Sequence, residues 1–174
     1  KAHPRVLDVL LQLLDAARVT TGRNRELDFS DWYVVLTSNI GAQRIMALRK
    51  SKFETMERLV RQEAQRELRP EIFARINAVV VFNKLDFDTQ RVIARDMIQA
   101  ECVAQGARGC DVRCHDTVPE VVIQRGFNDR LGARPMRDAT ELLVRNAIAA
   151  DLLAGGTGNG HLQPDADGLR LKLK

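Results

Sequence analysis

Two arginines lie close together just before an apolar run. Arg69 and Arg75 are six residues apart in LRPEIFARIN (68–77), and AVVVF follows directly. An arginine fixed on a turn at the edge of an α/β unit can reach a phosphate in a neighbouring subunit, as an arginine finger does in phosphoryl transfer. The alternative is an ion pair within the chain, with Glu71 or Glu67.

A second candidate is Asn39, the last residue of the triplet TSN (37–39). The triplet follows Trp32–Leu36, an apolar run that predicts a strand covered on both faces. The carboxyl end of such a strand faces the ligand crevice of an open α/β sheet, where a polar side chain can orient a substrate or a water molecule. The alternative is a simple turn before Gly41.

A third candidate is Arg134 in LGARPMRD (131–138), where Gly132 permits a tight turn and Pro135 suits the first turn of a helix. The helix dipole disfavours a cation at this end. A cation and a helix N-terminus together suit an external anion such as phosphate. The alternative is a solvated surface arginine.

The elements that must position these side chains follow from periodicity. Apolar residues at helical spacing predict helices over 3–19, 41–48, 53–68, 86–106, 117–126 and 134–153. Asp86 is expected to cap its helix, and Thr117 with Glu120 to form a capping box. The apolar face of 86–106 is predicted at Ile93, Met97, Ala100 and Ala104, and that of 134–153 at Met136, Ala139, Leu143, Ala147 and Ala150.

The predicted strands divide the chain into two parts. A hairpin is expected within 18–29, buried strands over Trp32–Leu36 and Ala78–Phe82, and short alternating strands over 110–114 and 168–174. The pattern of predicted helices and strands changes near Lys84, so we place a domain boundary there, between an α/β piece and a smaller α+β unit.

Composition limits the class of protein. The 174 residues are 45% hydrophobic and 29% charged, which is typical of one globular domain or two small ones. No apolar run approaches a membrane span, and the N-terminus lacks a signal-peptide pattern, so we expect a cytoplasmic protein with no membrane partner. Three cysteines are expected to be free thiols. The charge of +4 permits nucleic acid as a partner, but aromatics are only 5% and acidic residues are interspersed, so we expect none.

Other chemistries fit the sequence poorly. Cys110, Cys114 and His115 have the wrong spacing for a structural zinc site, so no metal site is expected. Ser38 has no convincing histidine partner for a hydrolase triad. The basic run RIMALRKSK (44–52) is followed by acidic residues and is interpreted as a solvated helix end.

Five segments in order resemble one family over nearly the whole chain. KAHPRVLDVLLQLLD, GR…DF, TSNIG, RPEIFARINAVVVF and LGARPMR are similar to the C-terminal AAA+ module of the Clp ATPases, most of all ClpB-like disaggregases. The resemblance implies an α/β fold: residues 1–84 form the trailing part of the P-loop-type core, and residues 85–174 form a small α+β lid subdomain.

The resemblance also assigns roles. It implies that Asn39 is the sensor-1 residue, which helps to position the attacking water. It implies that Arg75 is the arginine finger presented to the adjacent subunit's nucleotide, and that Arg134 is the sensor-2 residue of the lid. Ile93 matches a position that lines the adenine pocket. We therefore predict that Arg75 is substantially exposed, without a buried ion pair inside the chain.

The function implied for the intact protein is ATP-driven threading of polypeptide through a hexameric ring. ATP or ADP with Mg²⁺ would be its cofactor, and unfolded or aggregated polypeptide and a co-chaperone its partners. The chain begins just after the place of the family's magnesium-organising Asp-Glu pair, and no G-x-x-x-x-G-K-[ST] occurs. We therefore expect a C-terminal fragment of a longer ATPase that binds no nucleotide tightly and does not hydrolyse ATP alone.

Two departures keep alternatives open. The family's Asn-Arg-Ile-Asp is here Ala74-Arg75-Ile76-Asn77. No apolar triplet with a central glycine, of the kind that docks into the ClpP ring, lies between Ile40 and Phe53, which favours disaggregation over proteolysis. The alternatives are a ClpP-associated unfoldase subunit and a catalytically inactive assembly module.

Overall fold

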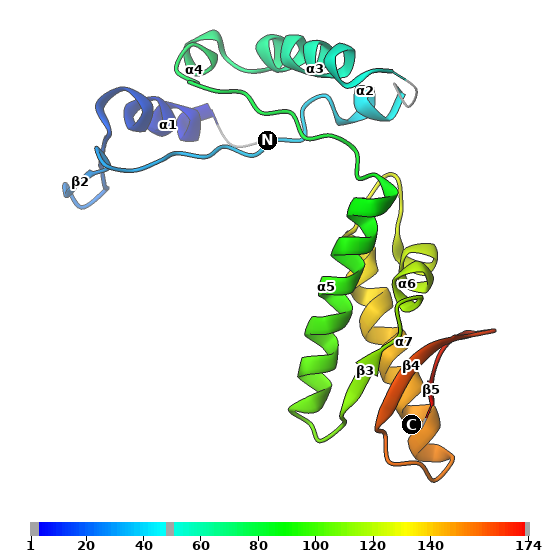
Figure 1. Ribbon diagram of the computed structural model, residues 1–174. Helices are drawn as coiled ribbons and strands as arrows, with labels where there is room; N and C mark the ends of the chain where they lie inside the picture. Colours follow the sequence, from blue (N-terminus) through cyan, green and yellow to red (C-terminus); the bar gives the residue numbers. More distant parts are fainter. Residues whose placement is uncertain (1–3, 48–50, 173–174) are drawn as a thin grey trace. The chain divides into compact units, whose positions relative to one another are not determined.

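The chain divides into two units, Lys1–Asn83 and Lys84–Lys174. A computed structural model describes residues 4–47 and 51–172 (Figure 1). The described helices and strands mix within both units, which confirms an α/β class of fold. Leu48, expected as the last residue of one helix, lies outside the described residues, as do the ends of the first helix and the last strand at 3 and 173–174.

Four helices and one hairpin are the regular elements described in the first unit. Its elements are α1 (Pro4–Ala16), β1 (Arg18–Thr20), β2 (Glu26–Asp28), α2 (Ala42–Ala47), α3 (Phe53–Glu67) and α4 (Pro70–Phe73). The three longer helices lie where the apolar spacing predicts them. The proline at the start of α4 suits a first helical turn, because its missing N–H would have no partner there.

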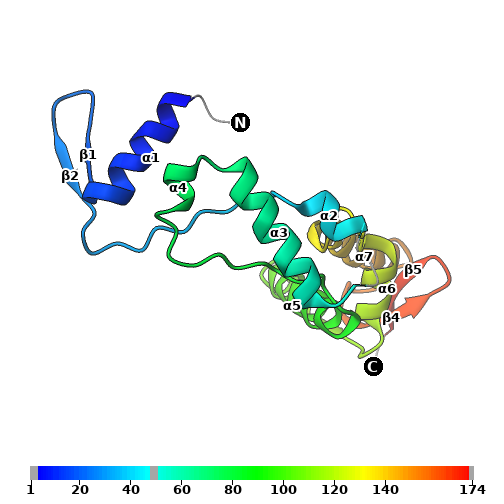
Figure 2. The same cartoon turned by 90° about the horizontal axis from the view of Figure 1, so that it is seen from above.

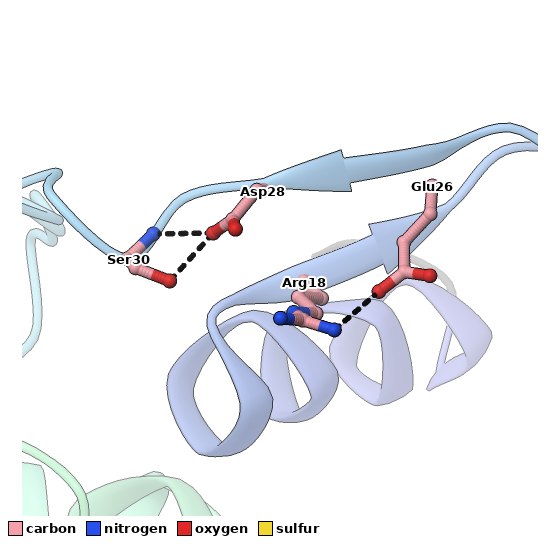
Figure 3. A network of polar contacts seen from close by, with 4 residues as sticks. All are labelled: Arg18, Glu26, Asp28 and Ser30. Atoms are coloured by element: carbon pink, nitrogen blue, oxygen red, sulfur yellow. Dashed lines mark hydrogen bonds and ion pairs between the residues drawn. The ribbon is translucent and has the colours of Figure 1, made fainter.

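The hairpin β1–β2 is confirmed. The two strands pair antiparallel with Arg18 opposite Asp28, and the backbone reverses through Asn24, whose φ is 58°. Arg18 and Glu26 form an ion pair at 3.1 Å across the strands (Figure 3). The hydroxyl and backbone N–H of Ser30 both donate to Asp28, and these bonds hold the pKa of the Asp28 carboxyl below its ordinary value.

The two buried strands expected in this unit are wrong. Neither Trp32–Leu36 nor Ala78–Phe82 pairs with any described residue. Most of their apolar side chains are instead exposed, with Tyr33 99% and Phe82 83% exposed, while Val79 and Val81 are half-buried. A strand needs neighbouring strands to bond its backbone and layers to cover its faces, and the described part of the chain provides neither.

The second unit packs three helices against a small sheet (Figure 1). Its elements are α5 (Phe87–Gly106), β3 (Val112–Cys114), α6 (Val118–Gly126), α7 (Arg134–Leu153), β4 (Gly160–Asp165) and β5 (Gly168–Lys172). The strand order is β3-β4-β5, with β3 parallel and β5 antiparallel to the central strand. The core side chains include Ile98, Val122, Met136, Val144 and Leu162, and all five are buried.

Strand β4 was not predicted from the sequence. Its residues HLQPD show no clean alternation and contain Pro164, which cannot donate to a ladder. The structure tolerates this proline because β3 pairs only as far as Leu162, so Pro164 has a strand on one side alone. Pairing with neighbours, rather than local propensity, makes this segment a strand.

The buried face of α5 differs from the predicted one. Ala94, Ile98 and Cys102 are buried, whereas Ala100 and Ala104 of the predicted stripe are exposed. The buried face also carries Glu101 and Gln105. These polar residues interrupt the apolar pattern, so the sequence does not indicate this face.

These two polar side chains are satisfied by contacts. The Gln105 side chain donates to Glu101 Oε1 at 2.6 Å, and Arg145 Nε of α7 donates to the same oxygen at 3.3 Å. The interface between α5 and α7 therefore contains a polar cluster beside its apolar core.

The predicted stripe of α7 is correct in part. Met136 and Ala147 are buried and Ala150 is exposed, while Thr140 and Val144 complete the buried face. Thr140 fits there because its hydroxyl donates to the Met136 carbonyl one turn earlier, at 2.7 Å.

One of the two expected caps is confirmed. The Thr89 N–H donates to Asp86 at 2.7 Å, so Asp86 caps α5. The capping box is wrong: the side chain of Thr117 caps no backbone N–H of α6 and instead lies 2.8 Å from His115 Nδ1. Glu120 pairs with Arg91 of α5 at 2.8 Å, so a tertiary contact replaces the local one.

Candidate functional site

Asn39 lies in an exposed turn. Its carbonyl accepts a hydrogen bond from the Ala42 N–H at 3.1 Å, and the Ser38 hydroxyl accepts one from the Ile40 N–H at 3.1 Å. These bonds form the turn that the sequence allowed as the alternative. The Asn39 amide side chain points to no described partner, so it is available for an external group.

Arg75 follows α4 directly and is tied to the start of the chain. Its Nε donates to Asp15 of α1, and its Nη1 donates to the Glu71 carbonyl at 2.5 Å. The side chain is 34% exposed and that of Asp15 is 50% exposed, so the pair lies at the surface. The hydrogen bond to Asp15 raises the pKa of the Arg75 guanidinium.

The prediction for Arg75 is therefore incomplete. The guanidinium is partly exposed and in no buried pair, but it does have a carboxylate partner. That partner is Asp15, not Glu71 or Glu67, which were the expected alternatives. Asp15 was missed because sixty residues separate it from Arg75.

Arg69 has a similar attachment at the other end of α4. Its Nη1 donates to Asp8 of α1 at 3.0 Å, and its Nε lies 3.6 Å from Glu71. The hydrogen bond to Asp8 raises the pKa of the Arg69 guanidinium. Both ends of α4 are thus attached to α1, beside which it lies (Figure 2).

Arg134 stands at the first position of α7. A tight turn precedes it, in which Gly132 has a φ of 67° and its N–H donates to the Asn128 carbonyl at 2.6 Å. Ala133 is the N-cap and has no side-chain acceptor, and the first turn of α7 carries no acidic residue. Arg134 is exposed, and no described residue bonds its guanidinium.

This arrangement fits a phosphate. The backbone N–H groups of an uncapped helix N-terminus and a free guanidinium are donors of the kind that bind phosphate oxygens. No side chain caps this helix end, and its first turn carries no carboxylate. Arg75 likewise retains unused N–H donors.

Ile93 is half-buried on α5 and packs against the core of the second unit. It belongs to the same unit as Arg134, whereas Asn39 and Arg75 belong to the first unit.

The described residues contain no group of three or more metal-ligating side chains. Cys102 is buried in the core, and burial raises the pKa of its thiol. No helix in the described ranges is long and apolar enough to cross a membrane.

Comparison with known families matches each unit to a different family model. Residues 1–79 match an AAA domain of the Cdc48 subfamily. Residues 85–162 match the C-terminal D2-small domain of ClpB protein.

Among curated proteins, a ClpA homolog of Cyanidium caldarium, an ATP-binding subunit of the Clp protease, is 30% identical over 172 residues. The ClpB chaperone of Vibrio vulnificus is 33% identical over 156 residues. The alignments cover 92% and 89% of this chain but only 20% and 18% of the relatives. The chain thus spans about a fifth of their length.

Solved structures of the Hsp104 chaperone share the fold. A closed-state reconstruction of Hsp104 with ATPγS and casein matches with a TM-score of 0.83 at 28% identity, over 100% of this chain and 32% of that one. The Saccharomyces cerevisiae Hsp104–ADP complex matches with a TM-score of 0.80 over 99% of this chain and 31% of that one.

Proposed function

Because this chain matches the C-terminal AAA+ module of the Clp ATPases, we propose that the full-length protein is an ATP-driven chaperone of the ClpB type. It threads aggregated or misfolded polypeptide through a hexameric ring. The observation that carries the proposal is the match of the whole chain to Hsp104, at a TM-score of 0.83.

Two units with separate roles follow from this proposal. Residues 1–84 are the trailing part of the large AAA+ subdomain, and residues 85–174 are the small lid. The matches of two different family models, over 1–79 and 85–162, support this division. Most apolar side chains of Trp32–Leu36 and Ala78–Phe82 are exposed here. This exposure supports the presence of further strands in the longer protein that pair with these segments.

The site residues keep the roles that the resemblance implies. Arg134, with the N-terminus of α7, binds nucleotide phosphate from the lid, and Ile93 lies against the adenine. Asn39 orients the attacking water with its free amide. Arg75 donates to a nucleotide held by the adjacent subunit, so that hydrolysis depends on ring assembly. The exposed positions of Asn39 and Arg134 and the unused N–H donors of Arg75 support the roles of these three residues.

ATP supplies the free energy of threading through hydrolysis of its γ-phosphate, with Mg²⁺ as the counter-ion. The 174 residues contain no phosphate-binding P-loop lysine motif. We therefore expect no magnesium-dependent ATP turnover by this chain alone. A co-chaperone is a further partner of the intact ring, and the cytoplasm is its site of action.

A second function is favoured by the names of two relatives. ATP-binding subunits of the Clp protease from Cyanidium caldarium and Staphylococcus epidermidis match at 30% and 29% identity, close to the ClpB values. An unfoldase that feeds ClpP is therefore the alternative.

The test is recovery of a heat-aggregated reporter enzyme by the full-length protein with ATP. We expect recovery that requires ATP, and Arg134→Ala should raise the KM for ATP, because a phosphate donor is lost. A protein that recovers no reporter but degrades casein when ClpP is added would support the alternative. A protein that does neither would overturn both.

A further inference from the structure

Two carboxylates on α1 hold the two arginines that flank α4. Asp8 and Asp15 are seven residues apart, which places them on one face of a helix two turns from each other. Asp8 accepts from Arg69 and Asp15 accepts from Arg75. The short helix α4 is thus attached to α1 at both ends.

The contacts of Arg75 leave one nitrogen of its guanidinium without a bond to any described residue. An arginine side chain has five N–H donors in a fixed plane. Nε is used by Asp15, and Nη1 by the Glu71 carbonyl. Among the described residues, nothing bonds Nη2, so this nitrogen keeps both of its donors.

We propose that Asp15 is a positioning residue for Arg75, which orients the guanidinium so that Nη2 is presented to a phosphate bound by the adjacent subunit. This inference rests on the proposed function. Arginine loses considerable rotamer freedom when it is fixed in one geometry. A carboxylate on Nε restricts that freedom before the phosphate arrives, and such pre-organisation favours the transition state.

A purely stabilising role explains the pair less well. The Arg75 side chain is 34% exposed and that of Asp15 is 50% exposed. Ion pairs at such exposed positions contribute little to stability, because water screens them and ordering long side chains costs entropy.

The test compares steady-state ATP hydrolysis by rings of the full-length protein. Asp15→Asn keeps the shape of the side chain but removes its charge, so we expect kcat to fall about 10- to 100-fold, with the KM for ATP unchanged. Asp15→Glu should restore part of the loss. Asp8→Asn is the matched control, because it disrupts the other ion pair on the same face of α1, and it should leave kcat within about twofold.

Coupling to Arg75 separates positioning from general disruption. Arg75→Ala should reduce kcat by about 10³-fold or more, and Asp15→Asn should reduce it no further in that background. If Asp15→Asn lowers kcat by the same factor with and without Arg75→Ala, or if Asp15→Asn alone has a normal kcat, the positioning role alone is overturned. A normal kcat in Arg75→Ala would instead overturn the proposed role of the arginine itself.

Discussion

Asp86 shows how one side chain fixes the start of an element. Its carboxylate accepts the backbone N–H of Thr89 at 2.7 Å, and hydrogen bonding from the Thr89 side chain and from this N–H holds the pKa of Asp86 below its ordinary value. A carboxyl whose pKa is lower in the folded state stabilises that state above its unfolded pKa, about 3.9. The stabilisation is lost as the pH falls through the folded pKa.

Asp86→Ala should therefore lower the Tm of this chain at pH 7, and its difference from the unsubstituted chain should shrink towards pH 2. Asp86→Asn is the control, because asparagine also caps helices but does not titrate. Its Tm at pH 7 should be close to that of the unsubstituted chain, and it should lack the pH-dependent part of the stabilisation. A Tm difference for Asp86→Ala that is equal at both pH values would contradict the cap. Thermal unfolding followed by circular dichroism measures the Tm of the unsubstituted chain and of both variants.

Residue positions set by local chemistry could be predicted from the sequence. The turn at Asn39, the cap at Asp86 and the helix-terminal position of Arg134 depend on neighbours within a few residues. Asp15 could not be found in this way, because its partner is sixty residues away. The seven-residue spacing from Asp8 was the one available signal, and it is common on exposed helices.

At the scale of elements, the close approach of α6 and α7 depends on a glycine. A Cβ placed on Gly126, the last residue of α6, would lie 2.6 Å from Met136 Cα and 2.9 Å from Ala139 Cβ. Backbone of α7 cannot yield as a flexible side chain would. The two helices therefore pack at a distance that only glycine permits.

Gly126→Ala should destabilise the chain by about 1 to 3 kcal/mol, because the added methyl overpacks a buried contact. Gly106→Ala is the matched control at the end of α5, since a Cβ there meets nothing within 4 Å. It should be neutral or stabilising by about 0.4 to 1 kcal/mol. Equal effects of the two substitutions in urea unfolding would argue against the close packing.

Helices were predicted better than strands for a physical reason. The amphipathic pattern of α1, α3 and α7 is contained within each helix, whose backbone bonds are internal. A strand depends on partners. Trp32–Leu36 has none among the described residues, and β4 became a strand through its neighbours despite Pro164.

For the whole molecule, the two units separate the candidate groups. Asn39 and Arg75 lie in the first unit, and Ile93 and Arg134 in the second. The core of buried apolar side chains in the second unit is formed by its own elements alone.

The most direct test of the central claim, that Arg75 acts on the adjacent subunit's nucleotide, mixes two disabled forms of the full-length protein. One carries Arg75→Ala, the other lacks its P-loop lysine, and any other nucleotide site is disabled in both. Each form alone should be inactive. Mixed rings should regain ATP hydrolysis, because some interfaces join an intact P-loop to an intact Arg75. Mixed rings that assemble but stay inactive would contradict the claim.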